Sequence, residues 1–189
     1  ADFAAGREGF LILDEIYQGL NHGPVPYQTG LAVRDDLYIL NSFSKFFGMT
    51  GWRLGWVVVP PEAIAPITKL AQNLFISPST PAQYAALAAF DEEAMVIHRQ
   101  RKEAFVQRAA LLSDGLQRLG FGIPVAPDGA FYLYVDISHT GMNSMDFCWR
   151  LIDEFQVAVT PGADFGEHHA DHYVRFAYTT HLDAIQSGL

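Results

Sequence analysis

Three short, continuous apolar runs in the first sixty residues constrain the fold of this chain most strongly. They cover residues 9–13, 37–40 and 54–59, and the first two end directly at polar side chains. Uninterrupted apolar runs of this length are typical of strands that are covered on both faces, as in a parallel sheet. We therefore expect three strands of a mostly parallel sheet, with polar groups at the carboxyl ends of the first two. Open α/β sheets bind their ligands at that edge.

The region after the third run has the composition of helices. Residues 61–74 form one expected helix, and residues 80–83 read Thr-Pro-Ala-Gln, the pattern of an N-cap with a capping box. From there to Gly120 the chain is rich in alanine, leucine, glutamate and arginine. Because this stretch is too long for one ordinary helix, we expect a break near residues 90–91 and a long connecting helix after it.

The last third of the chain mixes strand and helix patterns. The expected strands cover residues 130–136, 157–159 and 173–177, and the expected helix covers residues 144–155. The sequence therefore predicts an α/β protein with two domains. Residues 1–92 would be part of a large domain with the three-stranded sheet, and residues 93–189 the connecting helix and a small α+β domain.

Charge and cysteine content exclude several classes of protein. The net charge is −9, and the 12 basic residues are scattered, which argues against a nucleic-acid surface. The single cysteine, Cys148, excludes an internal disulfide and fits a reducing compartment. No apolar run approaches the ~20 residues that cross a bilayer. We expect a cytoplasmic protein that binds neither nucleic acid nor membrane.

A lysine in an unusual setting indicates chemistry. Lys45 lies just beyond the second apolar run, with Ser42 before it and Arg53 eight residues after it. A loop lysine ordinarily faces solvent. Here aromatic neighbours and the scarcity of other lysines favour a chemical role, and nearby glycines let the backbone pass close to a ligand.

Pyridoxal phosphate (PLP) is the cofactor whose requirements these residue types match. Its aldehyde forms a Schiff base with a lysine, its pyridine nitrogen needs a carboxylate, and its phosphate favours an arginine. The predicted roles are: Lys45 as covalent anchor, Asp14 as partner of the pyridine nitrogen, Tyr17 as donor to the ring oxygen, and Ser42 and Arg53 as phosphate ligands.

Arg175 lies in the middle of an expected strand, between Val174 and Phe176. An unpaired buried charge costs several kcal/mol, so this guanidinium should have an anionic partner. The pattern leaves two alternatives open: a structural ion pair, or the carboxylate of a substrate.

Four segments resemble, in order, spacing and residue type, the class I/II aminotransferases of PLP fold type I. They read Asp-Glu-Ile-Tyr at 14–17, Ser-Phe-Ser-Lys at 42–45, Gly-Trp-Arg-Leu-Gly-Trp at 51–56 and Val-Arg-Phe at 174–176. The resemblance implies a homodimer that moves an amino group between an amino acid and a 2-oxo acid. It also implies that Lys45 shuttles the proton at the substrate α-carbon and that Arg175 holds the α-carboxylate.

The departures from the family pattern lead to further expectations. Family members are about twice this length, so we expect the N-terminal half to be absent and an edge and an apolar face of the sheet to be exposed. The isolated 189 residues should then bind PLP weakly and turn over little. Residues 73–77 carry no cation where dicarboxylate-specific relatives place one, which disfavours aspartate and leaves neutral or aromatic amino acids open.

Other functions and other sites remain as alternatives. The same cofactor site would serve a PLP-dependent lyase or decarboxylase, and a non-catalytic effector domain of a transcription regulator would carry the same scaffold. The chain could also be the product of a truncated gene. His168, His169 and His172 have metal-ligand chemistry but lie in an expected loop, where spacing guarantees no convergence, so we predict no metal site. Cys148 is expected to be a buried small hydrophobe.

Overall fold

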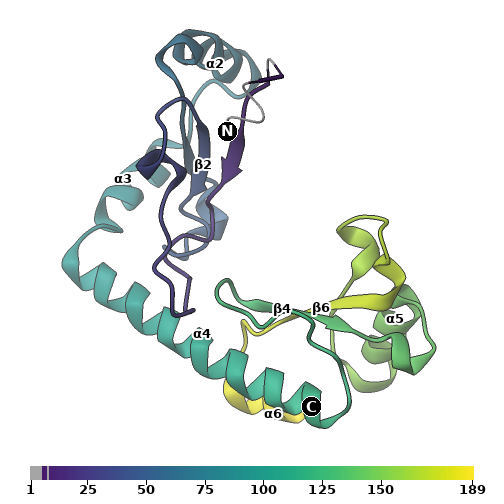
Figure 1. The fold of residues 1–189 in the computed structure, drawn as a ribbon. Coiled ribbons are helices and arrows are strands. Elements are labelled where there is room, and N and C mark those ends of the chain that lie inside the picture. Colours follow the sequence, from purple (N-terminus) through teal and green to yellow (C-terminus); the bar gives the residue numbers. More distant parts are fainter. Residues whose placement is uncertain (1–5, 8) are drawn as a thin grey trace. The chain divides into compact units, whose positions relative to one another are not determined.

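The computed structural model describes residues 6, 7 and 9–189, which divide into two compact units (Figure 1). The units are Ala1–Gln100 and Arg101–Leu189. The division falls inside the long helix α4 (Glu92–Arg118), which the sequence predicted as a connecting helix. The domain boundary expected between residues 92 and 93, which separates a large domain from a small one, stays a prediction. Among the described residues no helix has the length and apolar character that crossing a bilayer demands.

The first unit contains a three-stranded sheet in the order β1-β2-β3. The strands are β1 (Ile12–Asp14), β2 (Tyr38–Ser42) and β3 (Gly55–Val58). Strands β1 and β2 are parallel, but β3 runs antiparallel to β2. The expectation of a mostly parallel arrangement therefore holds for the first pair alone. The segment between β2 and β3 carries one short 3₁₀ helix, η2 (Thr50–Trp52), and no crossover helix of the kind that parallel neighbours need.

The faces of this sheet are less covered than the apolar runs suggested. All four residues of β3 are exposed, and in β1 only Leu13 is shielded. Phe10 and Ile12 are 68% and 51% exposed. The prediction of strands buried on both faces is wrong for this chain, whereas the predicted exposure of an apolar face is observed.

Three helices follow the sheet: α2 (Pro61–Leu74), α3 (Thr80–Ala88) and α4. The predicted break near residues 90–91 is present between α3 and α4. The predicted capping box is not formed, because α3 begins one residue early, with Ser79 as its N-cap. The Gln83 side chain instead donates a hydrogen bond to the carbonyl oxygen of Pro78 at 3.1 Å.

The second unit contains an antiparallel sheet in the order β4-β6-β5, two further helices and residues 101–118 of α4. The strand predicted at 157–159 lies slightly later, at 160–161. The core of the unit is formed by fully buried residues on and beside the two long strands, among them Val135 and Val174. The elements are β4 (Tyr132–Asp136), β5 (Thr160–Pro161), β6 (Tyr173–Ala177), α5 (Ser144–Phe155) and α6 (Leu182–Gly188). The remaining short 3₁₀ helices of the chain are η1 (Gly30–Ala32), η3 (Ser138–Thr140), η4 (Gly162–Asp164) and η5 (Ala170–His172).

Tyr178 makes the stability of this unit depend on pH. Its side chain is fully buried, and desolvation, with a smaller effect of Tyr132, raises its pKa from 10.0 to about 12. A raised pKa in the folded state stabilises the fold below pH 10, and that contribution is lost as the pH rises toward 12. We expect the urea-unfolding free energy of Tyr178→Phe to decline less over this range than that of the parent protein. The exposed Tyr84→Phe should behave as the parent, and an equal decline in the two variants would contradict the assignment.

Candidate active site

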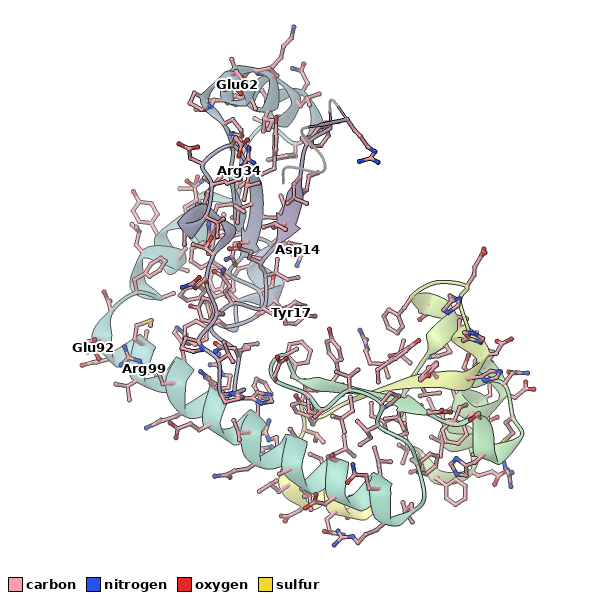
Figure 2. All side chains as sticks on the ribbon, viewed as in Figure 1. Asp14, Tyr17, Arg34, Glu62, Glu92 and Arg99 are labelled. Carbon is pink, nitrogen blue, oxygen red and sulfur yellow. The ribbon has the colours of Figure 1, made fainter. Side chains whose placement is uncertain are left out.

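Two strand ends bring the predicted cofactor ligands to one edge of the first sheet. Asp14 is the last residue of β1 and lies opposite Leu40, and Ser42 is the last residue of the parallel neighbour β2. The backbone N–H of Glu15 continues the ladder with a 2.9 Å hydrogen bond to the carbonyl of Leu40. Because the strands are parallel, the chain leaves both at the same edge. Figure 2 labels Asp14 and, in the turn that follows it, Tyr17.

Lys45 and Tyr17 converge at this edge from different segments. The Lys45 Nζ atom lies 5.5 Å from the centroid of the Tyr17 ring, within the range of a cation–π contact. Tyr17 belongs to the turn that follows Asp14, in which the N–H of Gln18 donates to the Glu15 carbonyl at 2.9 Å. The structure thus places the predicted anchor beside the residue predicted to bind the cofactor's ring oxygen.

Hydrogen bonds close the backbone around Lys45 into a compact loop. The Ser44 N–H donates to Ser42 Oγ at 3.0 Å, and Thr50 Oγ1 donates to the Ser44 carbonyl at 2.7 Å. The Gly48 N–H donates to the Lys45 carbonyl at 3.0 Å. Ser42 Oγ also lies 3.2 Å from the carbonyl oxygen of Leu54, to which it donates. The loop therefore holds Lys45 and Ser42 in one small, internally bonded segment.

Arg53 occupies a strained backbone position at the end of η2. Its φ is 53°, the left-handed region that residues other than glycine rarely adopt. Its Nη1 donates to the Thr50 carbonyl at 2.9 Å, and no carboxylate pairs with it in the described part of the chain. Non-glycine residues held in this region cluster at functional sites, and this guanidinium is available to an anion.

Gly55 keeps β3 close to Ser42. A Cβ atom at this position would lie 2.7 Å from the carbonyl oxygen of Asn41, which is backbone and cannot move aside cheaply. Gly55→Ala is expected to destabilise the protein by about 1–3 kcal/mol, the range for overpacking a tight site. Urea unfolding measures this change. Gly51→Ala is the matched control, since nothing lies within 4 Å of its added Cβ, and an equal loss in both variants would contradict the prediction.

The residues at this edge fit the chemistry of PLP. The Oδ1 atom of Asp14 accepts the N–H of Ile16 at 3.2 Å, and among the described residues Oδ2 has no hydrogen-bond partner. One carboxylate oxygen is therefore fixed by the backbone while the other is available to a protonated ring nitrogen. The lysine amine, the carboxylate, the phenol and the arginine come from the ends of adjacent strands and the loops that follow them.

Arg175 lies in the second unit, in β6, and is held by aromatic rings. Its guanidinium carbon is 4.7 Å from the centroid of Phe165 and 5.4 Å from that of Tyr132. Its Nη2 donates to Thr160 Oγ1 at 3.3 Å, while its Nε is buried without a hydrogen-bond partner. No carboxylate pairs with it within the described ranges, so the structural ion pair, one of the two alternatives, is absent there. The arrangement leaves a half-buried, oriented cation for an external carboxylate.

The residues that support the Lys45 loop were not among the predicted site residues. Phe46 and Phe47 follow the lysine directly and pack against His98 of α4, with ring centroids 5.5 Å apart in each pair. The run of aromatic residues around Lys45 was a signal for such packing. Nothing local indicated that His98 would be the contact.

The histidine cluster and the cysteine offer no second site. The His168 and His169 rings are 4.3 Å apart and those of His169 and His172 are 5.9 Å apart. Within the described residues no group of three or more His, Cys, Asp or Glu side chains could hold a metal ion. Cys148 is buried, as predicted, and burial raises its pKa to about 11, so it stays a thiol at neutral pH.

Comparison with known proteins places the chain in a family. The model of the family described as aminotransferase class I and II matches residues 1–185. Valine–pyruvate aminotransferase of Mycobacterium tuberculosis is 36% identical over 95% of this chain and 46% of its own length, and aspartate aminotransferase of Pyrococcus abyssi is 34% identical over 100% and 49%. The crystal structure of an aminotransferase from Mycobacterium tuberculosis matches 99% of this chain and 49% of its own, with a TM-score of 0.93 and 34% identity. The chain spans about half the length of the curated relatives it matches. It belongs to the class I and II aminotransferases, a family that depends on PLP.

Proposed function

We propose that this chain belongs to an enzyme that moves an amino group reversibly between an amino acid and a 2-oxo acid. The observation that carries the proposal is the convergence of Lys45 and Tyr17, with Asp14 ending the strand before Tyr17. The names of the relatives support the same reaction class. The whole protein's activity, substrates and partners are proposals, because the chain covers about half of those relatives.

Bound PLP supplies the electron sink that stabilises negative charge at the substrate α-carbon. In the proposal, Lys45 anchors the cofactor through Nζ, and the same amine then carries the proton removed from the α-carbon. Asp14 holds the proton on the ring nitrogen through Oδ2. Tyr17 donates its phenol hydrogen to the ring oxygen.

Binding of the two anionic groups completes the proposed roles. Arg53 and Ser42 bind the phosphate, for which the Ser42 hydroxyl has to turn its hydrogen away from the Leu54 carbonyl. Arg175 binds the α-carboxylate of the amino acid or 2-oxo acid, and its flanking rings keep the guanidinium plane oriented. The proposed contacts of Arg53 with the phosphate and of Arg175 with the carboxylate are charge-assisted and favour bidentate geometry.

We propose a neutral or aromatic amino acid as the substrate rather than aspartate. The segment after α2 reads Asn-Leu-Phe-Ile-Ser at residues 73–77, with no cation for a second carboxylate. Phe75 and Ile76 are 59% and 81% exposed. The relatives do not distinguish between a neutral and an acidic substrate, because their names include both valine–pyruvate and aspartate aminotransferases.

The enzyme is proposed to act as a cytoplasmic homodimer. Large apolar side chains on α2 and α3 are exposed, which supports burial against a second subunit. Among them are Leu70 at 60%, Leu74 at 77%, Tyr84 at 71% and Leu87 at 69%. The single cysteine supports a reducing compartment.

A single-turnover product assay tests the proposed reaction. The protein is loaded with PLP and mixed with a neutral or aromatic amino acid, and the products of one turnover are measured. We expect the matching 2-oxo acid in an amount equal to the cofactor consumed, without ammonia or carbon dioxide. Ammonia would instead indicate a lyase and carbon dioxide a decarboxylase. Cofactor binding without any product would favour the non-catalytic effector domain.

A further inference from the structure

The loop that carries Lys45 rests on a cluster of aromatic side chains within the first unit. The Phe47 ring lies 5.0 Å from that of Phe43 and 5.1 Å from that of Phe90, both measured between centroids. Phe46 packs edge-on against Phe47 at 5.3 Å. The Phe47–Phe90 and Phe46–Phe47 pairs are edge-to-face, and such pairs at these distances stabilise by roughly 0.5–1.5 kcal/mol beyond the area they bury. The two residues after Lys45 therefore attach its loop to the body of the unit.

His98 of α4 is the polar member of this cluster. It is only 6% exposed, and its ring centroid lies 5.5 Å from those of Phe46 and Phe47. Its Nε2 atom lies 3.2 Å from the carbonyl oxygen of Ala89, just after α3. Because a carbonyl can only accept, Nε2 carries the hydrogen in this bond. His98 thus bonds to the end of α3 while its ring supports both phenylalanines.

Gly19 ties the same cluster to the turn that carries Tyr17. Its φ is +90°, and a Cβ atom there would lie 2.7 Å from the Phe46 ring. The glycine follows Tyr17 by two residues, and the Leu20 N–H donates to the Tyr17 carbonyl at 3.0 Å. Phe46 therefore contacts both the turn that follows Asp14 and Tyr17 and the ring of His98.

We propose that His98 is a positioning residue for Lys45. Through Phe46 and Phe47 it fixes the Lys45 loop against the turn that bears Asp14 and Tyr17. The inference rests on the proposed function only in treating Lys45 as the cofactor anchor. A catalytic group must be held within ~0.5 Å of its working position by its supporting shell, and a surface loop does not achieve this by itself.

Amide hydrogen exchange tests the proposal without cofactor or substrate. The reporters are the Gly48 N–H, bonded to the Lys45 carbonyl, and the Met49 N–H, bonded to the Phe43 carbonyl, each at 3.0 Å. The internal reference is the Glu15 N–H, bonded to Leu40 in the sheet. In His98→Leu we expect the two loop amides to exchange roughly tenfold faster, the factor for one lost hydrogen bond, and the sheet amide to be unchanged.

Matched variants separate positioning from general destabilisation. Arg99→Gln changes an exposed neighbour on the same helix, which pairs with Glu92 at 3.1 Å, and should leave all the amides unchanged. Gly19→Ala displaces the Phe46 ring from the other contact and should accelerate the same loop amides. His98→Gln, which keeps an amide donor toward Ala89, and Gly19→Ala keep the test valid if His98→Leu does not fold. Equal acceleration of loop and sheet amides, or no acceleration, overturns the proposal.

A second measurement connects the loop to the cofactor. After incubation with PLP and reduction with borohydride, the extent of labelling at Lys45 should fall at least several-fold in His98→Leu and stay at the parent level in Arg99→Gln. Absence of label at Lys45 in the parent protein would contradict the proposed function. The exchange rates would still decide whether His98 positions the loop.

Discussion

Replacing Lys45 with arginine is expected to abolish covalent trapping of PLP by borohydride. The chain has three lysines, Lys45, Lys69 and Lys102, so the labelled peptide identifies the anchor unambiguously. Arginine keeps the positive charge but stays protonated, with a pKa above ~12, and offers no nucleophilic nitrogen. Mass spectrometry of the reduced, digested protein should show the label on the peptide that carries Lys45 in the parent and no label in the variant.

The control for Lys45→Arg is the same substitution at Lys69, an exposed residue of α2. It should leave both the amount and the position of the label unchanged. If the label is found on Lys69 or Lys102, or if the Lys45 variant keeps it, the anchor assignment is wrong. In an amino-transfer assay of the whole enzyme, Lys45→Arg should lose activity by roughly 10⁴-fold or more, as is typical when the reacting nucleophile is removed.

Arg175→Met should weaken binding of the substrate carboxylate while leaving the fold intact or slightly more stable. Loss of the charge-assisted contact removes about 3 kcal/mol, which corresponds to a roughly 100-fold rise in KM for the amino acid. Methionine fills the space between Phe165 and Tyr132 without a desolvated charge. Removing a half-buried cation whose Nε atom has no hydrogen-bond partner offsets the lost cation–π contacts.

Both substrate binding and stability must be measured for Arg175→Met, because a structural ion pair and a carboxylate site predict opposite results for these two quantities. A carboxylate site gives weaker substrate binding with an unchanged or slightly higher urea-unfolding midpoint and unchanged labelling of Lys45. A structural ion pair gives lower stability, by about 3–5 kcal/mol, with unchanged substrate binding. Arg150→Met is the matched control, since Arg150 is exposed and pairs with Glu154 at 2.8 Å on the surface of α5. It should change neither quantity by much.

Local sequence signals predicted the elements well. Strand-to-turn boundaries at Asp14 and Ser42, and the helices at 61–74 and 144–155, were legible because caps, prolines and apolar runs act within a few residues. Because these signals act only locally, they did not predict the antiparallel direction of β3 or the exposure of the strands. The direction of β3 depends on how the chain returns from residue 42 to residue 55. The predicted coverage of the strands depends on what packs on the sheet, which no apolar run specifies.

The sequence by itself determined the chemistry and the family, because a lysine, an aspartate, a tyrosine and two arginines in fixed order have few other uses together. Tertiary structure decided the rest. It brought Lys45 Nζ to the Tyr17 ring, Arg175 to the rings of Phe165 and Tyr132, and His98 of α4 to Phe46 in the Lys45 loop. These contacts join residues far apart in the chain. They form only when the packing of whole elements repays the entropy of closing the segments between them.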